Sequence, residues 1–254
     1  MARYVDSLDG WIQEGKWPLL PCPTCLHPTL RPIEVTNADS AEATRNRRHQ
    51  DWQPDWMSGT FRALFECSDI SCGERVTVAG DYGTDVFPRE TYDDPHWADY
   101  YRVRATLPAL PILSVPSGTP ESVRKSIGMA AAIVWMDPNA AAGRLRIAVE
   151  QLLTSFRIPV SRVGKDGKRH RLSLHSRILR FKKSHQVAGD ALEAVKWIGN
   201  SGSHPSGVTT VDVLDCAEML EYALRDLYDK TDATMRRRIQ TVNKARGVPR
   251  RRAK

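Results

Sequence analysis

The stretch DPNAAAGRLRIAVE, residues 137–150, decides the fold of the C-terminal half of this chain. Asp137 followed by Pro138 is a typical helix start, because an aspartate side chain caps free N–H groups and proline suits the first helical position. Apolar residues then recur at steps of four and three, which places them in one stripe along a helix. This stripe consists of Ala141, Leu145, Ala148, Leu152 and Phe156. The stretch therefore predicts an amphipathic helix that packs against other helices.

Similar signals lie on both sides of this helix. Thr119-Pro120-Glu121 predicts the start of an earlier helix that runs through Ala130–Trp135. Thr210 predicts the cap of a long final helix with its own apolar stripe. We therefore expect a mainly α protein, in which residues 119–235 form a helical bundle.

Four cysteines in two close pairs mark the N-terminal half. Cys22 and Cys25 form a C-x2-C pair, and Cys67 and Cys72 form a C-x4-C pair. Four thiolates complete a tetrahedral zinc shell and leave no coordination position open for water. The spacing predicts one structural Zn²⁺ per chain. The alternatives are unrelated reduced cysteines or a redox pair.

The other segments complete the expected domain organisation. Aromatic and β-branched residues around the second cysteine pair predict a small antiparallel ribbon, so residues 1–80 are expected to form a β zinc-ribbon module with an inserted basic loop. Residues 81–118 contain five prolines, which disfavour long regular elements, so we expect a linker packed on the helical part. Residues 236–254 are expected to form a basic tail.

Composition is typical of a globular protein, with 41% hydrophobic and 26% charged residues. No apolar run reaches the roughly 18–20 residues of a membrane span, and the N-terminus has no signal-peptide pattern. A cytoplasmic protein without a membrane partner is therefore expected. The formal net charge is +7, but residues 236–254 hold nine Lys or Arg residues and no acid, which leaves −2 for the rest of the chain.

The basic tail predicts an electrostatic contact with nucleic acid. The same cations would also suit a solubilising terminus or the C-terminal end of a helix. The candidate nucleic-acid-binding residues of the tail are Arg236, Arg237, Arg238, Arg250, Arg251 and Arg252.

A polar turn between two expected helices holds candidate catalytic residues. In KWIGNSGSHP, residues 196–205, two glycines permit a tight backbone and Asn200 suits a turn. His204 is a candidate general acid or base. The alternative is that Asn200 and His204 only satisfy backbone groups of the loop.

Residues about 105–230 resemble a bacterial domain-of-unknown-function branch of the HEPN superfamily. The resemblance rests on Leu107-Pro108, the stretch 137–150, the GN-x3-HP turn at 199–205 and Thr210-x-Asp212 at the start of a long helix. It implies an up-and-down helical bundle that is often dimeric. Many members of the superfamily are metal-independent ribonucleases of toxin–antitoxin and phage-defence systems.

The resemblance also implies roles for individual residues. The family usually pairs an Arg and a His four to six residues apart, but here the nearest cation before His204 is Lys196. His204 would move protons at the 2′-hydroxyl or the leaving oxygen, and Asn200 would orient it or bind phosphate. Lys196, Arg144 or Arg146 would stabilise charge on the phosphate.

Two functions are therefore expected from the sequence. The first is a protein that acts on nucleic acid, RNA more than DNA, as an endoribonuclease in bacterial stress response or phage defence. The second is a non-catalytic module, in which the zinc ribbon and the helices bind nucleic acid or a protein partner. The missing Arg favours the second function, and a homodimer is compatible with both.

Overall fold

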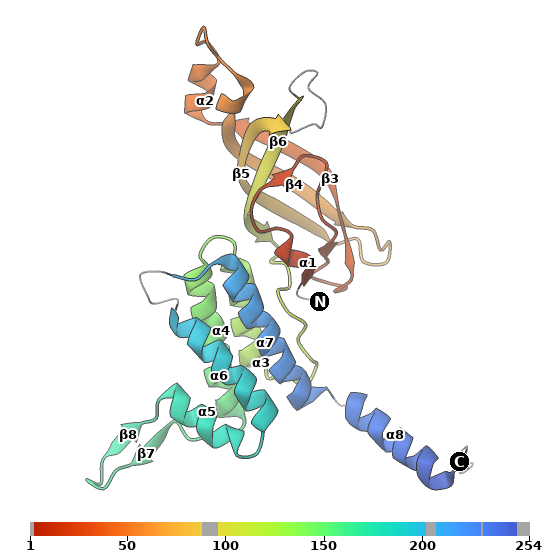
Figure 1. Ribbon diagram of the computed structural model, residues 1–254, viewed down its shortest axis with the longest axis vertical. Helices are drawn as coiled ribbons and strands as arrows, with labels where there is room; N and C mark the ends of the chain where they lie inside the picture. The colour runs from red at the N-terminus through yellow and green to blue at the C-terminus, as the bar shows by residue number, and fades with distance from the viewer. Residues whose placement is uncertain (1–2, 88–95, 202–206, 230, 248–254) are drawn as a thin grey trace.

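The computed structural model describes residues 3–87, 96–201, 207–229 and 231–247. Figure 1 shows two parts, a curved β-sheet formed by the N-terminal half and a group of helices formed by the C-terminal half. Helices account for 43% of the chain and strands for 25%, and the sheet is an antiparallel half-barrel of six strands. The expectation of a mainly α protein with a small ribbon is therefore wrong, because the β part is a large sheet of six strands.

The sheet has the strand order β1-β6-β5-β4-β3-β2, and each neighbouring pair is antiparallel. Along β4, Phe61, Ala63 and Phe65 are buried and the residues between them are half-buried or exposed. Trp17 packs on Phe61, Phe65 and Tyr101, with ring centroids 5.7, 5.4 and 5.3 Å apart. The strand bounds are β1 Ile12–Gln13, β2 Leu20–Pro21, β3 Pro28–Asp39, β4 Ser58–Cys67, β5 Arg75–Phe87 and β6 His96–Leu107.

Strands β5 and β6 occupy most of the region in which the sequence predicted a linker without long regular elements, so that prediction is wrong up to residue 107. The prolines bound the strands and do not interrupt them. Pro88 and Pro95 fall in the segment between β5 and β6, outside the described residues, and Pro108 directly follows β6. Proline is tolerated at such strand ends, where no ladder hydrogen bond is lost.

β3 forms most of one edge of the sheet. β2 pairs only with Leu30 and Pro28, so within the described chain residues 31–39 have β4 on one side and no strand on the other. A register shift between Pro32 and Glu34 bulges this edge, and all residues from 31 to 39 are exposed. The edge is therefore long, irregular and open to solvent.

Residues 108–118 connect the sheet to the helices as a packed strap. Leu110, Ile112 and Leu113 are buried. The Ser114 N–H donates to Glu221 Oε2 of α7 (Thr210–Tyr228) over 2.9 Å, and Glu221 is itself buried. One continuous cluster of buried residues consequently runs from the sheet into the helical part.

The predicted helix start at Asp137 is confirmed. Its side chain accepts a hydrogen bond from the Ala140 N–H over 2.9 Å, and Pro138 is the first residue of α4. The cap of α7 is Thr209, one residue before the predicted position, in a reciprocal capping box with Asp212. The remaining bounds are α1 Arg3–Asp6, α2 Ala41–Asn46, η1 Pro54–Trp56, α3 Glu121–Ile133, α4 Pro138–Ser155, β7 Ser161–Val163, β8 Arg169–Arg171, α5 Leu174–Lys182, α6 Gln186–Ser201 and α8 Thr231–Ala245.

Among the described residues, no helix combines the length and the apolar character needed to cross a bilayer.

Candidate functional site

The strand pairing brings the two cysteine pairs to one place. Cys22 directly follows β2, and Cys67 is the last residue of β4. Leu30 of β3 lies opposite Leu20 on one side and opposite Cys67 on the other, so β3 holds the two pairs together. The four sulfur atoms of Cys22, Cys25, Cys67 and Cys72 all lie within 4.8 Å of one another. The prediction that these cysteines could hold a metal ion is confirmed.

The distances between the sulfur atoms fit one tetrahedral ion. Cys22 Sγ lies 3.6 Å from Cys72 Sγ, and Cys25 Sγ lies 3.8 Å from Cys67 Sγ. A tetrahedron with metal–sulfur bonds of about 2.3 Å has edges of about 3.8 Å. A disulfide would need about 2.05 Å, and all four thiols are free. The arrangement therefore suits a metal ion better than a pair of disulfides.

Each cysteine pair ends in a backbone turn of the same kind. Leu26 follows Cys25 with φ 63°, and Gly73 follows Cys72 with φ 59°. The Leu26 N–H donates to the Cys22 carbonyl over 2.9 Å. These left-handed residues fold each pair back on itself, which lets both sulfur atoms of a pair face one point.

The thiols of the first pair differ in acidity. The His27 backbone N–H hydrogen-bonds to Cys25 and lowers its pKa to about 6, whereas burial raises the pKa of Cys22 to about 12. A bound cation would favour the thiolate at both positions. Cys25 also belongs to a second group of three potential ligands, together with His27 and Asp69. The ligand atoms of these three residues all lie within 4.8 Å of one another.

The helical part contains an open pocket of about 480 Å³ between α4 and α6. Arg144 and Arg146 line it from α4, and Asn200 lines it from the last turn of α6. Arg146 Nε donates to Asn200 Oδ1 over 3.1 Å, and Arg146 Nη1 lies 3.1 Å from Glu150 Oε1. Three residues that the sequence predicted separately are thus brought together in one cationic pocket.

Gly199 makes this contact between α4 and α6 possible. A Cβ atom at this position would lie 2.8 Å from Arg146 Cβ and 3.2 Å from the Ala142 carbonyl oxygen. Only a residue without a side chain lets the two helices approach this closely. Gly143 also lines the pocket, but a Cβ atom there would meet nothing within 4 Å.

Lys196 is placed differently from Asn200. Its side chain is buried, and Nζ lies 3.0 Å from the centroid of the Trp197 ring, in a cation–π contact. Burial lowers the pKa of Lys196, the nearby charge of Glu193 opposes this shift, and the charge of Arg146 adds to it. Lys196 does not line the pocket that Arg144, Arg146 and Asn200 share.

His204, Arg250, Arg251 and Arg252 lie outside the described residues. On the C-terminal side of the His204 segment, the Val208 N–H donates to Asn139 Oδ1 at the start of α4 over 2.9 Å. Asn139 precedes Ala140, which lines the pocket. Of the tail residues, Arg236, Arg237 and Arg238 belong to α8, and Arg238 is exposed.

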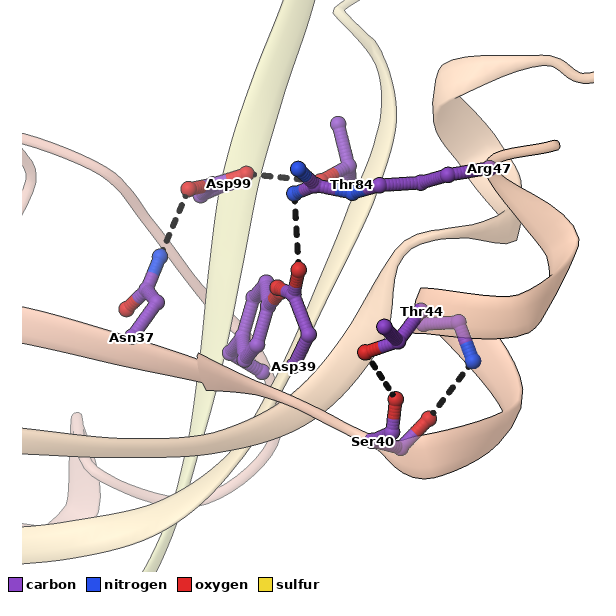
Figure 2. Close-up of polar contacts among 9 residues, drawn as sticks. Asn37, Asp39, Ser40, Thr44, Arg47, Thr84 and Asp99 are labelled. Carbon is purple, nitrogen blue, oxygen red and sulfur yellow. Dashed lines mark hydrogen bonds and ion pairs between the residues drawn. The ribbon is translucent and has the colours of Figure 1, made fainter.

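The sheet carries a polar pocket of about 460 Å³ that the sequence did not predict. Figure 2 shows its two halves. Asp99 of β6 accepts from Asn37 Nδ2 over 2.8 Å and from Thr84 Oγ1 over 2.7 Å. Asp39 of β3 pairs with Arg47 Nη2 over 2.7 Å and also accepts from the Tyr82 hydroxyl.

This polar pocket holds the loop that contains α2 against the sheet. Ser40 caps α2, because its Oγ accepts from the Ala43 N–H over 3.0 Å, and Arg47 directly follows that helix. Burial and the hydrogen bond to Asp39 raise the pKa of Tyr82, which keeps the phenol neutral. The carboxylates already have donors from the protein, so we interpret this pocket as a structural anchor.

The only signal for this pocket in the sequence is alternation. Asn37 and Asp39 are two residues apart on β3, and Tyr82 and Thr84 are two residues apart on β5, so each pair shares a face. The register that aligns them with Asp99 of β6 cannot be read from the sequence.

Two family models match parts of the chain. Residues 129–249 match a family described as a domain of unknown function, DUF4145, and residues 11–104 match a second family with the same description, DUF8608. No curated protein and no solved structure matches the chain. The helical pocket falls within the first match, and the four cysteines fall within the second. Each candidate site therefore lies within a different family match.

Proposed function

We propose that this protein binds nucleic acid, RNA in preference to DNA, at the pocket between α4 and α6. The observation that carries the proposal is the contact between Arg146 and Asn200 beside Arg144 in one open pocket. Arg144 has no ion pair or hydrogen bond within the described part of the chain, so its guanidinium is available. A guanidinium group matches two phosphate oxygens in one plane.

The resemblance to the HEPN superfamily extends the proposal to cleavage of RNA, with a role in bacterial stress response or phage defence. His204 would move protons at the 2′-hydroxyl, and Arg144 and Arg146 would stabilise the charge that develops on the phosphate. In the sequence His204 comes four residues after Asn200, which lines the pocket, and four residues before Val208, whose N–H donates to Asn139. Arg146 would supply the guanidinium that the sequence lacks close to His204.

A non-catalytic binding module for nucleic acid or a protein partner is the second candidate function. Lys196 favours it, because its ammonium group lies over Trp197 and not in the pocket. One of the three residues that the sequence predicted for catalysis is therefore engaged elsewhere.

Binding is tested by fluorescence anisotropy with single-stranded RNA and with DNA of the same sequence, at increasing salt. Loss of one cation that contacts phosphate lowers the slope of log affinity against log salt by about one. We expect this change for Arg144→Ala and for Arg146→Ala. Arg180→Ala removes an exposed cation of α5 and serves as the matched control. Equal slopes for all three variants would contradict the pocket as a phosphate site.

Cleavage is tested separately on the same RNA without added divalent metal. The catalytic form of the proposal requires that the wild type cuts RNA and that His204→Ala binds RNA without cutting it. If the wild type binds but does not cut, and the pocket variants lose binding, the non-catalytic function is the correct one.

We further propose that the ion held by the four cysteines is zinc with a structural role. Support comes from the all-sulfur donor set and from sulfur distances close to the edge of a zinc–thiolate tetrahedron. The site joins β2, β4 and the turn before β5, so a bound ion would fasten one end of the sheet.

Metal analysis and thiol titration test this assignment together. We expect one zinc per chain, four thiols that react only after chelation, and a fifth that reacts only after unfolding. The fifth is Cys216, which is fully buried in α7. Rapid reaction of the first four thiols before chelation, or a metal content far below one per chain, would refute a structural zinc.

A further inference from the structure

Helix α8 exposes an apolar stripe that nothing in the described chain covers. Met235, Ile239 and Val242 are 49%, 51% and 46% exposed, and their steps of four and three place them on one side of the helix. Figure 1 shows α8 extending away from the other helices, so no neighbouring element shields this stripe.

A helix in this situation needs a partner. With 15 residues, α8 is at the length at which an isolated helix is only marginally stable in water. The family match at residues 129–249 includes the whole of α8, so the helix belongs to the same unit as α4–α7. We therefore expect the apolar side of α8 to be covered by another element in the assembled protein.

The outer face of α7 has complementary properties. Val211 and Tyr222 are 47% and 56% exposed. Asp215, Glu218 and Asp226 are exposed, and none of them has an ion pair among the residues that the structure describes. The five residues recur at steps of three and four, so they form one stripe of mixed apolar and acidic character. The stripe from Val211 to Asp226 is about 22 Å long, the same as α8.

Charge favours α8 as the occupant of this face. Arg238 and Arg246 flank the apolar stripe of α8 and are exposed, and the chain has no acid after Asp232. In the structure α8 extends away from α7 of the same chain and does not cover this face (Figure 1). Nucleic acid would neutralise the cations but leave the three apolar side chains in water. A second copy of this chain provides both kinds of contact.

We propose that α8 of one copy packs along the outer face of α7 of a second copy, so that two copies exchange their C-terminal helices reciprocally. Met235, Ile239 and Val242 lie against Val211 and Tyr222 of the other copy, and arginines of α8 face its acids. The inference goes beyond the proposed function, because it concerns assembly and holds with or without RNA.

A charge-exchange experiment tests the proposal by sedimentation equilibrium of the full chain without RNA. We expect a wild-type dimer. Asp215→Lys with Glu218→Lys reverses two charges on the outer face of α7 in one variant, and Arg238→Glu with Arg246→Glu reverses the two charges beside the apolar stripe of α8 in another. Each variant alone places like charges together, so we expect dimer affinity to fall by at least about tenfold. In an equimolar mixture both interfaces are complementary again, and we expect heterodimers.

Two further variants make the result decisive. Ile239→Asp puts a charge into the apolar stripe at an exposed position, so it should give a folded monomer with unchanged helix content by circular dichroism. Glu42→Lys changes the charge of α2 and should leave the dimer intact. A wild-type monomer, or a dimer that neither Ile239→Asp nor the charge variants weaken, would overturn the proposal. Loss of RNA binding by Ile239→Asp from a monomeric wild type would assign α8 to RNA and would also overturn it.

Discussion

At the scale of single residues, Gly199 determines whether the helical pocket exists. The pocket depends on the contact between Arg146 and Asn200, and these residues are 54 positions apart in the chain. Gly199 lets their helices approach, because a Cβ atom there would lie 2.8 Å from Arg146 Cβ. The glycine of a turn-like sequence therefore acts inside a helix, as a point of close packing.

Replacement of this glycine tests the close packing directly. Alanine is favoured over glycine within a helix by about 1 kcal/mol. We expect Gly199→Ala to lower the free energy of unfolding despite this preference, by about 1–3 kcal/mol, because α4 and α6 must separate. Gly143→Ala is the matched control, since a Cβ atom there meets nothing within 4 Å, and it should raise the stability by about 0.5–1 kcal/mol. Urea unfolding measures both changes, and a gain at both positions would contradict the packing argument.

At the scale of helices and strands, the sequence predicted the elements whose signals are local. Helix α4 has a cap, a proline and a clean apolar stripe, and it begins at the expected residue. The sequence indicated an extended segment up to residue 35, but the last part of β3 was missed because residues 36–39 are polar or small and no alternation of apolar residues marks them. Strand β6 was missed because the prolines around it were interpreted as breaks within a linker.

The candidate sites, like the helices and strands, were predicted only where the sequence signal is local. The cysteines were found because two short spacings in one chain suffice to predict a shared ion. The polar pocket of the sheet was missed because Asp39, Tyr82 and Asp99 come from three strands, and only their register brings them together. Spacing along the chain therefore predicts a site only where the ligands of each pair are neighbours in sequence.

Lys182 joins α5 to α6 and makes their packing depend on pH. Its Nζ lies 2.5 Å from Asp190 Oδ1 and 2.7 Å from Glu193 Oε2. Hydrogen bonds from Lys182 lower the pKa of both carboxyl groups below their ordinary values of 3.8 and 4.5. The folded state therefore binds fewer protons than the unfolded state, so this stabilisation is complete above about pH 4.5 and is lost as the pH falls through the lowered values.

The variant Lys182→Met should reveal this dependence. We expect it to cost about 1–2 kcal/mol of unfolding free energy at pH 7, because the carboxylates lose a charged donor. The difference from the wild type should shrink below about pH 4, where the carboxyl groups of both proteins become protonated. Lys183→Met, on the exposed side of the same helix end, is the control. A difference that stays constant from pH 7 to acid would exclude the ion pairs as its source.

At the scale of the whole molecule, the sheet and the helices share one core. The two family matches leave residues 105–128 between them, and this interval holds the buried strap and most of α3. Ser114 in the strap is tied to Glu221, whose carboxylate is buried in α7. The boundary between the matches is therefore not a flexible joint, since its side chains belong to the core of the protein.

The strap can be loosened by one substitution. Glu221→Ala removes the acceptor of the Ser114 N–H and leaves a small void, so we expect a loss of about 1–3 kcal/mol in unfolding free energy. Glu221→Gln keeps an acceptor oxygen and should lose much less. Thermal unfolding of both variants measures the difference, and equal losses would show that the hydrogen bond does not hold the strap.

The open edge of β3 has a consequence for the behaviour of the protein at high concentration. Unpaired strand edges recruit further strands, and stacking of this kind leads to fibrils. Here Pro32, the adjoining bulge and the charges of Arg31 and Glu34 make the edge a poor template for a flat, extended strand. Replacing Pro32 with valine would restore a backbone N–H group to this edge. The protein should then aggregate at a lower concentration, although no buried side chain changes.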